Sequence, residues 1–330
     1  MSLSRIVRFH ELGGPKVLRL EQGHISAPGP DEARIRVRAI GLNRADVMFR
    51  RGRYLEKASL PSRLGFEASG VVEALGPGTH TLAIGDAVGV VPGASLGLYG
   101  TYADHLVIPT RYLLKQPESL SDQEAAALWM SYLTPYGALV EVANVKAGDW
   151  VMLSAATSSV GLAAIQIVRQ LGARPIATTL TSDMRDALLE AGAAAVIATR
   201  EEPLGQRLME ISGTGIDVAF DAVGGSLVAE LAEAMAIRGR IIIHGALSDE
   251  PTPFPLKLAL RNSLTLRGYV YTEVTRNADS LARAHTFITR GVAEGTIRPR
   301  IDKVFTLDEV VEAHRYLESG QQFGKIVMTT

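Results

Sequence analysis

A run of small and hydroxyl-bearing residues links a short apolar segment to a helical pattern near the middle of the chain. Residues 151–153 are apolar, and the chain then reads Ser154-Ala155-Ala156-Thr157-Ser158-Ser159-Val160-Gly161 before apolar residues recur at helical spacing. A helix that starts directly after a strand presents free backbone N–H groups, which bind phosphate oxygens. The pattern therefore predicts a dinucleotide diphosphate site formed by Ala156, Ser158, Ser159, Val160 and Gly161.

This turn only partly matches the GxGxxG pattern of dinucleotide-binding turns. Ala156 and Ser158 stand where the first two glycines would be, and Gly161 keeps the third, which lets the helix pack closely on the strand. Small residues still permit a tight turn, and serine hydroxyls add donors beside the helix N-terminus. An ordinary serine-rich turn of a parallel sheet is the alternative interpretation, and the flanking pattern favours the cofactor site.

The residues that follow bear on which dinucleotide is bound. A site selective for NAD needs an Asp or Glu about 20 residues after the glycine turn, to bind the ribose 2′-hydroxyl. Residues 177–182 read Ala-Thr-Thr-Leu-Thr-Ser and contain no carboxylate. Thr179, Thr181 and Arg185 therefore favour the 2′-phosphate of NADPH. Asp183 lies slightly beyond this stretch, so NADH remains the alternative cofactor.

Composition limits the classes of protein that this chain can represent. Its 330 residues suggest two domains, with 47% hydrophobic and 21% charged residues, as in soluble globular enzymes. The net charge of −1 predicts no nucleic-acid partner. There is no cysteine, and the seven histidines form no HxH or HxxxH pair, so we expect no metal. The first residues lack an apolar signal core and no run resembles a membrane span, so we expect a cytoplasmic protein with a small-molecule substrate and no membrane partner.

Two patterns of periodicity divide the chain into elements. Residues 34–40 alternate basic and apolar, and the first 125 or so residues look mostly β. Residues 122–139 predict a helix, opened by a capping box of Ser121 and Glu124. Apolar strands then alternate with helices, at 150–153, 175–178, 195–198, 217–220, 240–244 and 264–270. This alternation predicts an α/β fold with a Rossmann doubly wound parallel sheet over residues 128–270. Residues 1–127 and 271–330 would form the second domain.

Six short motifs make the chain resemble a known superfamily. They are Gly41-Leu42-Asn43-Arg44-Ala45-Asp46, Gly65-Phe66-Glu67-Ala68-Ser69-Gly70, Gly85-Asp86-Ala87-Val88, Leu133-Thr134-Pro135-Tyr136-Gly137-Ala138, the unit from Val151 to Gly161, and Gly324-Lys325-Ile326-Val327. Together they resemble the medium-chain dehydrogenase/reductase superfamily, and within it the zinc-independent quinone oxidoreductase group of zeta-crystallin-like proteins. The resemblance spans nearly the whole chain and implies that the β-rich domain is a GroES-like catalytic domain.

The resemblance also bears on the chemistry. Zinc alcohol dehydrogenases of the superfamily hold their catalytic metal with a Cys, a His and a Cys, and the matching positions here are Asn43, Phe66 and Met130. Without a Lewis acid an alkoxide is not stabilised, whereas hydride addition to a quinone or enone delocalises the charge. The resemblance therefore implies an NADPH-dependent reductase of a quinone or another activated alkene or carbonyl.

Site residues follow from the same resemblance. It implies that Asn43, Asp46 and Tyr54 are catalytic and border the substrate pocket. The remaining positions assigned to the cofactor are Thr134, His244, Gly245, Ala246 and Lys325. The lysine and tyrosine often found around the 2′-phosphate are replaced by Met184 and Thr199, which leaves Arg185 and Arg200 as substitutes.

Several of these residues have simpler interpretations. Tyr54 donates a proton to the substrate or is only a half-buried packing group. Asp46 orients Asn43 or the ribose, or it caps the following helix, and the cap is slightly favoured.

Other residues near the expected site are interpreted in the same way. Arg50, Arg51 and Arg53 recruit an anion or form a solvated basic face, and the solvated face is favoured. For His244 a strand-end histidine with satisfied hydrogen bonds is favoured. Met130 is most simply a core residue.

Two alternative functions stay open. One is an enoyl-thioester or enone reductase, with Met48, Phe66, Leu96 and Tyr99 shaping an apolar pocket. The other is a non-catalytic NADPH-binding structural or RNA-binding protein. The resemblance also suggests a homodimer formed through the edge strand at 264–270.

Overall fold

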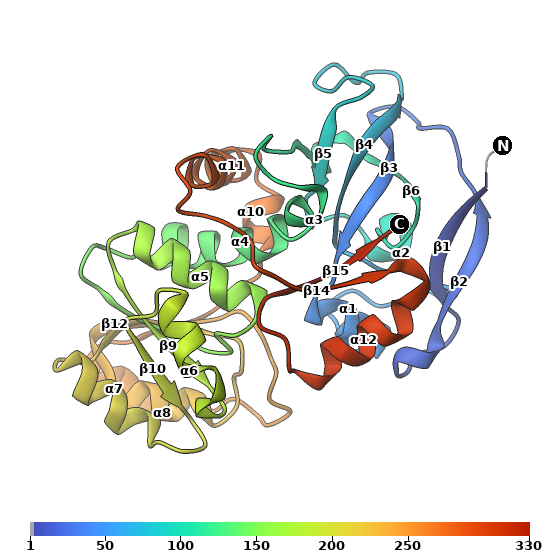
Figure 1. The fold of residues 1–330 in the computed structure, drawn as a ribbon. Coiled ribbons are helices and arrows are strands. Elements are labelled where there is room, and N and C mark those ends of the chain that lie inside the picture. Colours follow the sequence, from blue (N-terminus) through green and yellow to red (C-terminus); the bar gives the residue numbers. More distant parts are fainter. Residues whose placement is uncertain (1–2) are drawn as a thin grey trace. The chain divides into compact units, whose positions relative to one another are not determined.

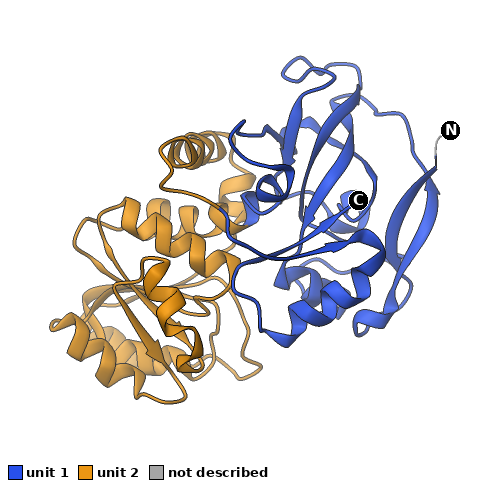
Figure 2. Ribbon diagram, in the orientation of Figure 1, with its two compact units in different colours: residues 1–130, 299–330 blue, residues 131–298 orange. Residues whose placement is uncertain are grey.

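The computed structural model describes residues 3–330 and divides the chain into two compact units (Figure 2). Unit 1 contains the chain up to Met130 together with Pro299–Thr330, and unit 2 is Ser131–Arg298. Residues 271–298, expected in the domain of the N-terminal strands, therefore cluster with the parallel sheet. The reason is tertiary: Glu141 of unit 2 accepts hydrogen bonds from Ser280 and Arg283 of the helix in this segment.

Unit 1 is built on a seven-stranded, mainly antiparallel sheet with the order β14-β15-β3-β4-β5-β7, and β6 pairs with β3. The strands are β3 (Glu32–Gly41), β4 (Glu67–Leu75), β5 (Ala87–Val90), β6 (His105–Pro109), β7 (Leu113–Lys115), β14 (Ile301–Thr306) and β15 (Lys325–Thr329). A separate hairpin joins β1 (Leu3–Phe9) and β2 (Leu18–His24). Ile35, Val37 and Ala39 of β3 are buried, as the alternating sequence predicts.

Unit 2, in which Figure 1 labels β9, β10 and β12, contains a six-stranded parallel sheet with the order β10-β9-β8-β11-β12-β13. The strands are β8 (Trp150–Leu153), β9 (Arg174–Thr179), β10 (Ala195–Ala198), β11 (Ile216–Asp221), β12 (Met235–Ile243) and β13 (Thr265–Gly268). This is the 3-2-1-4-5-6 order of a Rossmann sheet, so the predicted fold class is confirmed. The strand order reverses between β8 and β11, and ligands bind outside the carboxyl ends of the strands at such a point.

Helices flank this sheet in unit 2. They include α5 (Ser159–Gln170), α6 (Arg185–Glu190), α7 (Leu204–Ser212), α8 (Leu227–Glu233), α9 (Leu256–Asn262), α10 (Thr272–Thr275) and α11 (Ala278–Ala293). Helix α5 buries most of its length, from Gly161 to Val168, and is followed by Gly172 in a left-handed conformation. Both features fit a helix whose sequence is apolar nearly all round and is followed by glycine. No helix among residues 3–330 is long and apolar enough to cross a membrane.

The helix predicted over residues 122–139 is broken into three pieces. These are α3 (Asp122–Ala125), α4 (Trp129–Pro135) and a π-helical segment, η3 (Tyr136–Val142). The predicted capping box is confirmed, because Ser121 Oγ accepts from the N–H of Glu124 at 3.3 Å and the Glu124 carboxylate accepts from the N–H of Ser121 at 2.9 Å. Proline cannot donate a helical hydrogen bond, so Pro135 accounts for the change of winding after α4.

Unit 1 also carries two helices that matter for the site. They are α1 (Arg44–Arg50), which follows β3 directly, and α12 (Val310–Ser319), which precedes β15. The two helices pack against each other in unit 1.

Candidate functional site

The turn between β8 and α5 has the geometry of an anion-binding helix start. Ser158 is the N-cap of α5, and its Oγ accepts a hydrogen bond from the N–H of Gly161 at 3.0 Å. The hydroxyl proton of Ser158 is therefore left to donate outward, and the N–H groups of Ser159 and Val160 lie in the first helical turn, where no helical acceptor exists. This arrangement provides both donors and a favourable helix dipole for a phosphate.

Gly161 packs against the turn that precedes it. A Cβ placed on Gly161 would lie 2.6 Å from the Cα of Ala156 and 2.7 Å from its carbonyl oxygen. The turn itself is held by the N–H of Ala156, which donates to the carbonyl of Thr178 at 3.0 Å. The close helix packing predicted for Gly161 is confirmed, and Ala156 and Ser158 supply the tight turn without glycine.

A serine and an aspartate join the two strands at the switch point. Ser154 Oγ, after β8, donates to Asp221 Oδ1 at the end of β11 at 2.7 Å, and it accepts from the N–H of Ala222 at 2.7 Å. The Asp221 carboxylate also accepts from the N–H groups of Val223 and Gly224, at 3.0 and 2.8 Å. The sequence analysis did not single out this pair, although an aspartate directly after the apolar residues 218–220 was a signal visible in the sequence.

The two arginines expected to bind a 2′-phosphate differ in their hydrogen-bond partners. The guanidinium of Arg185 donates to the carbonyl of Val196 at 2.7 Å and forms an ion pair with Glu202. Arg200 is exposed, its N–H donates to the carbonyl of Leu180 at 3.1 Å, and its side chain has no partner among residues 3–330. Arg200 is therefore the arginine whose charge is available beside the end of β9.

Two threonine hydroxyls form hydrogen bonds near the carboxyl end of β9. Thr199 Oγ1 donates to the carbonyl of Thr179 at 3.2 Å, and Thr181 Oγ1 donates to Asp183 at 2.9 Å. The Asp183 carboxylate therefore lies against Thr181, within the stretch of residues 177–182 that itself contains no carboxylate.

His244 follows β12 at the carboxyl edge of the sheet. Its ring stacks on Phe220 with a centroid separation of 3.8 Å and an interplanar angle of 13°. Its Nε2 is buried and has no hydrogen-bond partner among residues 3–330. The favoured interpretation of a fully satisfied strand-end histidine is therefore wrong. The next residue, Gly245, runs close to Ala222, because a Cβ on Gly245 would lie 2.5 Å from the Ala222 carbonyl oxygen, and Ala246 beyond it is exposed.

Unit 1 contains a buried cluster of Asn43, Glu67 and Lys325. Lys325 Nζ donates to Asn43 Oδ1 at 2.7 Å and forms an ion pair with Glu67. Asn43 Nδ2 donates to Glu67 Oε1 at 3.1 Å and to the carbonyl of Gly41 at 3.2 Å, while the N–H of Met130 donates to Glu67 Oε2 at 2.9 Å. The two side-chain charges are almost completely buried, with 1% exposure each. The ammonium of Lys325, which was assigned to the cofactor, is thus engaged within unit 1.

Asp46 lies beside this cluster and is fully buried. Its Oδ2 accepts from the N–H of Asn43 at 2.9 Å and from the hydroxyl of Tyr102 at 3.2 Å, and Tyr102 Oη lies 3.2 Å from His314 Nε2. Asp46 thus caps α1 in a capping box with Asn43. Burial raises the pKa of Asp46 to about 7, although hydrogen bonding to Asn43 and the charge of Lys325 lower it. Burial also lowers the pKa of His314 to about 3, so this imidazole is neutral.

The other predicted residues occupy apolar or structural positions. Tyr54 is half-buried, and its ring meets Phe66 edge-on at 5.4 Å. Phe66 and Met130 are buried core residues, and Thr134 is a buried residue of α4. Phe66 has no metal-ligating atom, and no group of three His, Cys, Asp or Glu side chains among residues 3–330 could hold a metal.

The three arginines after α1 do not behave as one solvated face. Arg50 is fully buried, where its guanidinium pairs with Glu318 of α12 and donates to the carbonyl of Gly13 at 2.5 Å. Arg51, which is exposed, pairs with the same Glu318, and Arg53 is exposed. The favoured interpretation is therefore wrong for Arg50, which joins α1 to α12.

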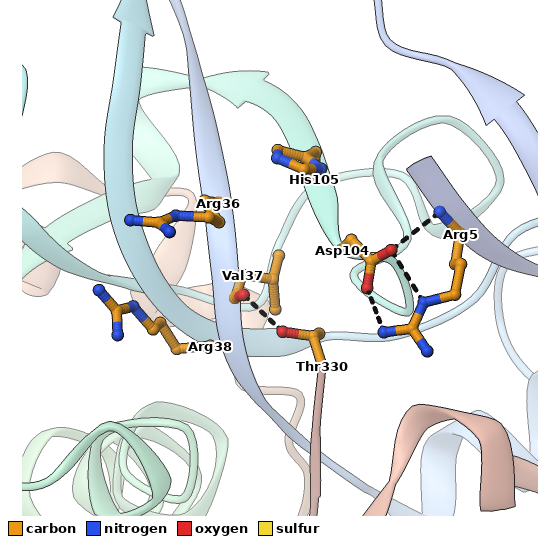
Figure 3. A pocket seen from close by; sticks show the side chains of 7 residues that line it. All are labelled: Arg5, Arg36, Val37, Arg38, Asp104, His105 and Thr330. Atoms are coloured by element: carbon orange, nitrogen blue, oxygen red, sulfur yellow. Dashed lines mark hydrogen bonds and ion pairs between the residues drawn. The ribbon is translucent and has the colours of Figure 1, made fainter. Parts of the chain in front are cut away.

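Unit 1 also contains a surface pocket of about 360 Å³ (Figure 3). It is lined by Arg5, Arg36, Val37, Arg38, Asp104, His105 and Thr330. Arg5 turns toward Asp104 and contacts both of its oxygens, at 3.0 and 2.8 Å, whereas Arg36 and Arg38 point away from Asp104. The pocket includes none of the predicted site residues.

Comparison with known proteins identifies the class to which this fold and site belong. Two family models match, the alcohol dehydrogenase GroES-like domain over residues 29–118 and the zinc-binding dehydrogenase over residues 191–328. Together with the relatives described next, these matches show an NAD(P)H-dependent oxidoreductase of the medium-chain dehydrogenase/reductase superfamily.

Individual relatives narrow this class. Quinone oxidoreductase 1 of Escherichia coli (strain K12) is 32% identical over 331 residues, covering 98% of each chain. A 2-haloacrylate reductase of Burkholderia sp. is 28% identical over 327 residues, covering 97% of each chain. The crystal structure of Escherichia coli quinone oxidoreductase complexed with NADPH superposes with a TM-score of 0.92 at 29% identity, over 99% of this chain and 100% of that one. The chain belongs to the zinc-independent quinone oxidoreductase group.

Proposed function

We propose that the protein is an NADPH-dependent reductase of a quinone or another activated alkene or carbonyl. The observation that carries the proposal is the turn from Ala156 to Gly161, where a capped helix start and a glycine without room for a side chain form a diphosphate cradle. Support comes from the structural neighbour complexed with NADPH and from relatives named for reduction of quinones and of 2-haloacrylate, which is an activated alkene.

The chain's own residues take distinct roles in this proposal. When bound, NADPH supplies the hydride. The start of α5 holds the diphosphate, and the Asn43 amide is fixed in unit 1 by its hydrogen bonds with Gly41, Glu67 and Lys325. Asp46 positions Asn43 through its backbone N–H. Tyr54 is the candidate that delivers a proton from its hydroxyl to the reduced oxygen.

Substrate class is tested by the loss of NADPH absorbance with three acceptors side by side: a 1,4-benzoquinone, a 2-enoyl thioester and a saturated aldehyde. We expect saturable, quinone-dependent oxidation of NADPH and no reaction with the aldehyde, because residues 3–330 contain no side-chain cluster that would hold a metal to polarise its carbonyl. Turnover confined to the enoyl thioester would replace the quinone with that substrate. Binding of NADPH without turnover of any acceptor would favour a non-catalytic protein.

Cofactor preference is predicted to depend on Arg200. Since its guanidinium is free beside the end of β9, Arg200→Ala should weaken NADPH binding about tenfold, as expected for loss of a charged hydrogen bond to phosphate, and leave NADH binding unchanged. Arg185→Ala is the matched control, because the Arg185 guanidinium already donates to the carbonyl of Val196 and pairs with Glu202. Fluorescence titrations with both nucleotides measure the effect, and equal losses for NADPH and NADH would contradict it.

We further propose that two copies pair through the edge strand β13. This strand ends the sheet of unit 2. In the same unit, Ile237 of β12, Phe254, and Leu256 and Leu260 of α9 expose 77%, 61%, 56% and 73% of their surface. An open strand edge and exposed large apolar side chains both favour an interface. Light scattering should find a dimer for the native chain and a monomer for Leu260→Glu. Leu189→Glu on α6 is the control that should stay dimeric, and a monomeric native chain would refute the interface.

A further inference from the structure

His244 combines a fixed ring with an unused hydrogen-bonding atom. Its backbone N–H donates to the carbonyl of Asp221 at 2.8 Å, which extends the β11–β12 pairing one residue beyond the strand. The parallel stack on Phe220, itself 1% exposed, sets the plane of the imidazole. The direction in which Nε2 faces is therefore determined by the sheet and not by a mobile loop.

The protonation state of His244 follows from its surroundings. Burial lowers the pKa of His244 to about 3, partly offset by a hydrogen bond to its own backbone, so the ring is neutral at physiological pH. Nε2 has no partner among residues 3–330, and in a neutral imidazole one nitrogen carries the proton while the other accepts. With the proton on Nδ1, Nε2 presents a lone pair that only accepts.

An unpaired acceptor at this depth destabilises the folded chain. Burying a polar group without a hydrogen bond costs free energy, and native proteins satisfy nearly all such groups. An aromatic ring without nitrogen, such as phenylalanine, would keep the stack on Phe220 and remove the cost. The nitrogen is therefore better explained by a ligand than by the stability of the fold.

The position of His244 identifies the part of the ligand. In the 3-2-1-4-5-6 order, β8, β9 and β10 form one mononucleotide-binding half of the sheet, and β11, β12 and β13 form the other. The diphosphate cradle lies after β8 and Arg200 after β10, so they serve the adenosine half. His244 follows β12, on the half of the sheet that serves the nicotinamide riboside. The backbone of Gly245, the next residue, lies so close to Ala222 that it has no room for a side chain.

We propose that His244 Nε2 accepts a hydrogen bond from the nicotinamide riboside half of the bound cofactor, given by its carboxamide N–H or by a ribose hydroxyl. The inference rests on the proposed NADPH-binding function. It adds one residue of this chain, His244, that accepts a hydrogen bond from an uncharged N–H or O–H group of the cofactor. No proton is transferred, and the imidazole acts only as an acceptor.

Binding and stability measurements on the cofactor-free protein test this role together. His244→Phe should weaken NADPH binding about tenfold, because the buried donor of the ligand loses its acceptor. The same variant should raise the Tm by roughly 2 °C, since a buried unpaired nitrogen is removed. His244→Gln, which restores an acceptor oxygen, should recover part of the affinity. A half-buried histidine of α11, His285, provides the control His285→Phe, which should leave affinity unchanged.

Nucleotide analogues distinguish the two donors. The 3-acetylpyridine analogue of NADPH has no carboxamide N–H, so if that group is the donor the native protein and His244→Phe should bind this analogue equally. If a ribose hydroxyl is the donor, the variant should lose about tenfold with both nucleotides. In ¹⁵N NMR spectra, saturation with NADPH should shift Nε2 of His244 upfield while Nδ1 stays protonated.

The outcomes separate this inference from the function on which it rests. If the native protein binds no NADPH, the proposed function fails. If the native protein binds NADPH but His244→Phe binds it equally well and the Nε2 signal does not move, the role of His244 is refuted and the proposed function stands.

Discussion

Replacement of Lys325 by methionine is expected to lower the free energy of unfolding by about 3–5 kcal/mol, the range for breaking a buried ion pair by removing one partner. Lys325 and Glu67 are both 1% exposed, so the variant leaves the Glu67 carboxylate buried without its counter-charge. Asn43 and the N–H of Met130 still donate to Glu67, but neither carries a charge. Equilibrium denaturation with urea measures the loss.

Two comparisons isolate the ion pair. Lys16→Met, at an exposed position of unit 1, should change the free energy of unfolding by less than about 0.5 kcal/mol. The double variant Lys325→Met, Glu67→Gln should recover much of the loss, because it leaves no unpaired charge. A Lys325→Met effect no larger than that of Lys16→Met would show that the pair is not buried as described.

The second large effect is expected at Gly161. Gly161→Ala should weaken NADPH binding by roughly 100-fold, the scale of a misplaced binding group, and destabilise the fold by about 1–3 kcal/mol through overpacking. The added Cβ would lie 2.6 Å from Ala156 Cα, which is backbone and can yield only if the diphosphate turn moves. Calorimetric titration with NADPH and thermal unfolding measure the two effects.

A second helical glycine supplies the control for Gly161. Gly205 of α7 has its nearest neighbour, the carbonyl of Glu230, at 3.6 Å from the position of an added Cβ. Gly205→Ala should therefore keep NADPH affinity and unfold at the same or a higher temperature. Retained NADPH affinity in Gly161→Ala would mean that the diphosphate does not sit on this turn.

Local sequence signals predicted the parallel sheet and its cofactor turn. Buried parallel strands read as short apolar runs, and all six predicted runs became strands of the unit 2 sheet. Ser121 and Ser158 acted as helix N-caps because capping depends on residues within one turn of the chain. The tight contact at Gly161 was equally predictable, since a strand-turn-helix unit demands it.

Features set by distant contacts were not predictable in this way. Lys325 bonds to Asn43, 282 positions away in the chain, and to Glu67, 258 positions away. No local sequence pattern predicts contacts at such separations. No local pattern in residues 271–298 tells which unit their helix α11 joins. The same limit applies to Arg185 and Arg200, because the bonds of Arg185 to Glu202 and to the carbonyl of Val196 appear only in the folded chain.

The most direct test of the account is a calorimetric titration of the purified native protein with NADPH, alongside Gly161→Ala. We predict saturable heat with one nucleotide per chain for the native protein and a titration too weak to saturate for the variant. No heat from the native protein, or the same binding curve from both proteins, would contradict the claim that the start of α5 holds the cofactor.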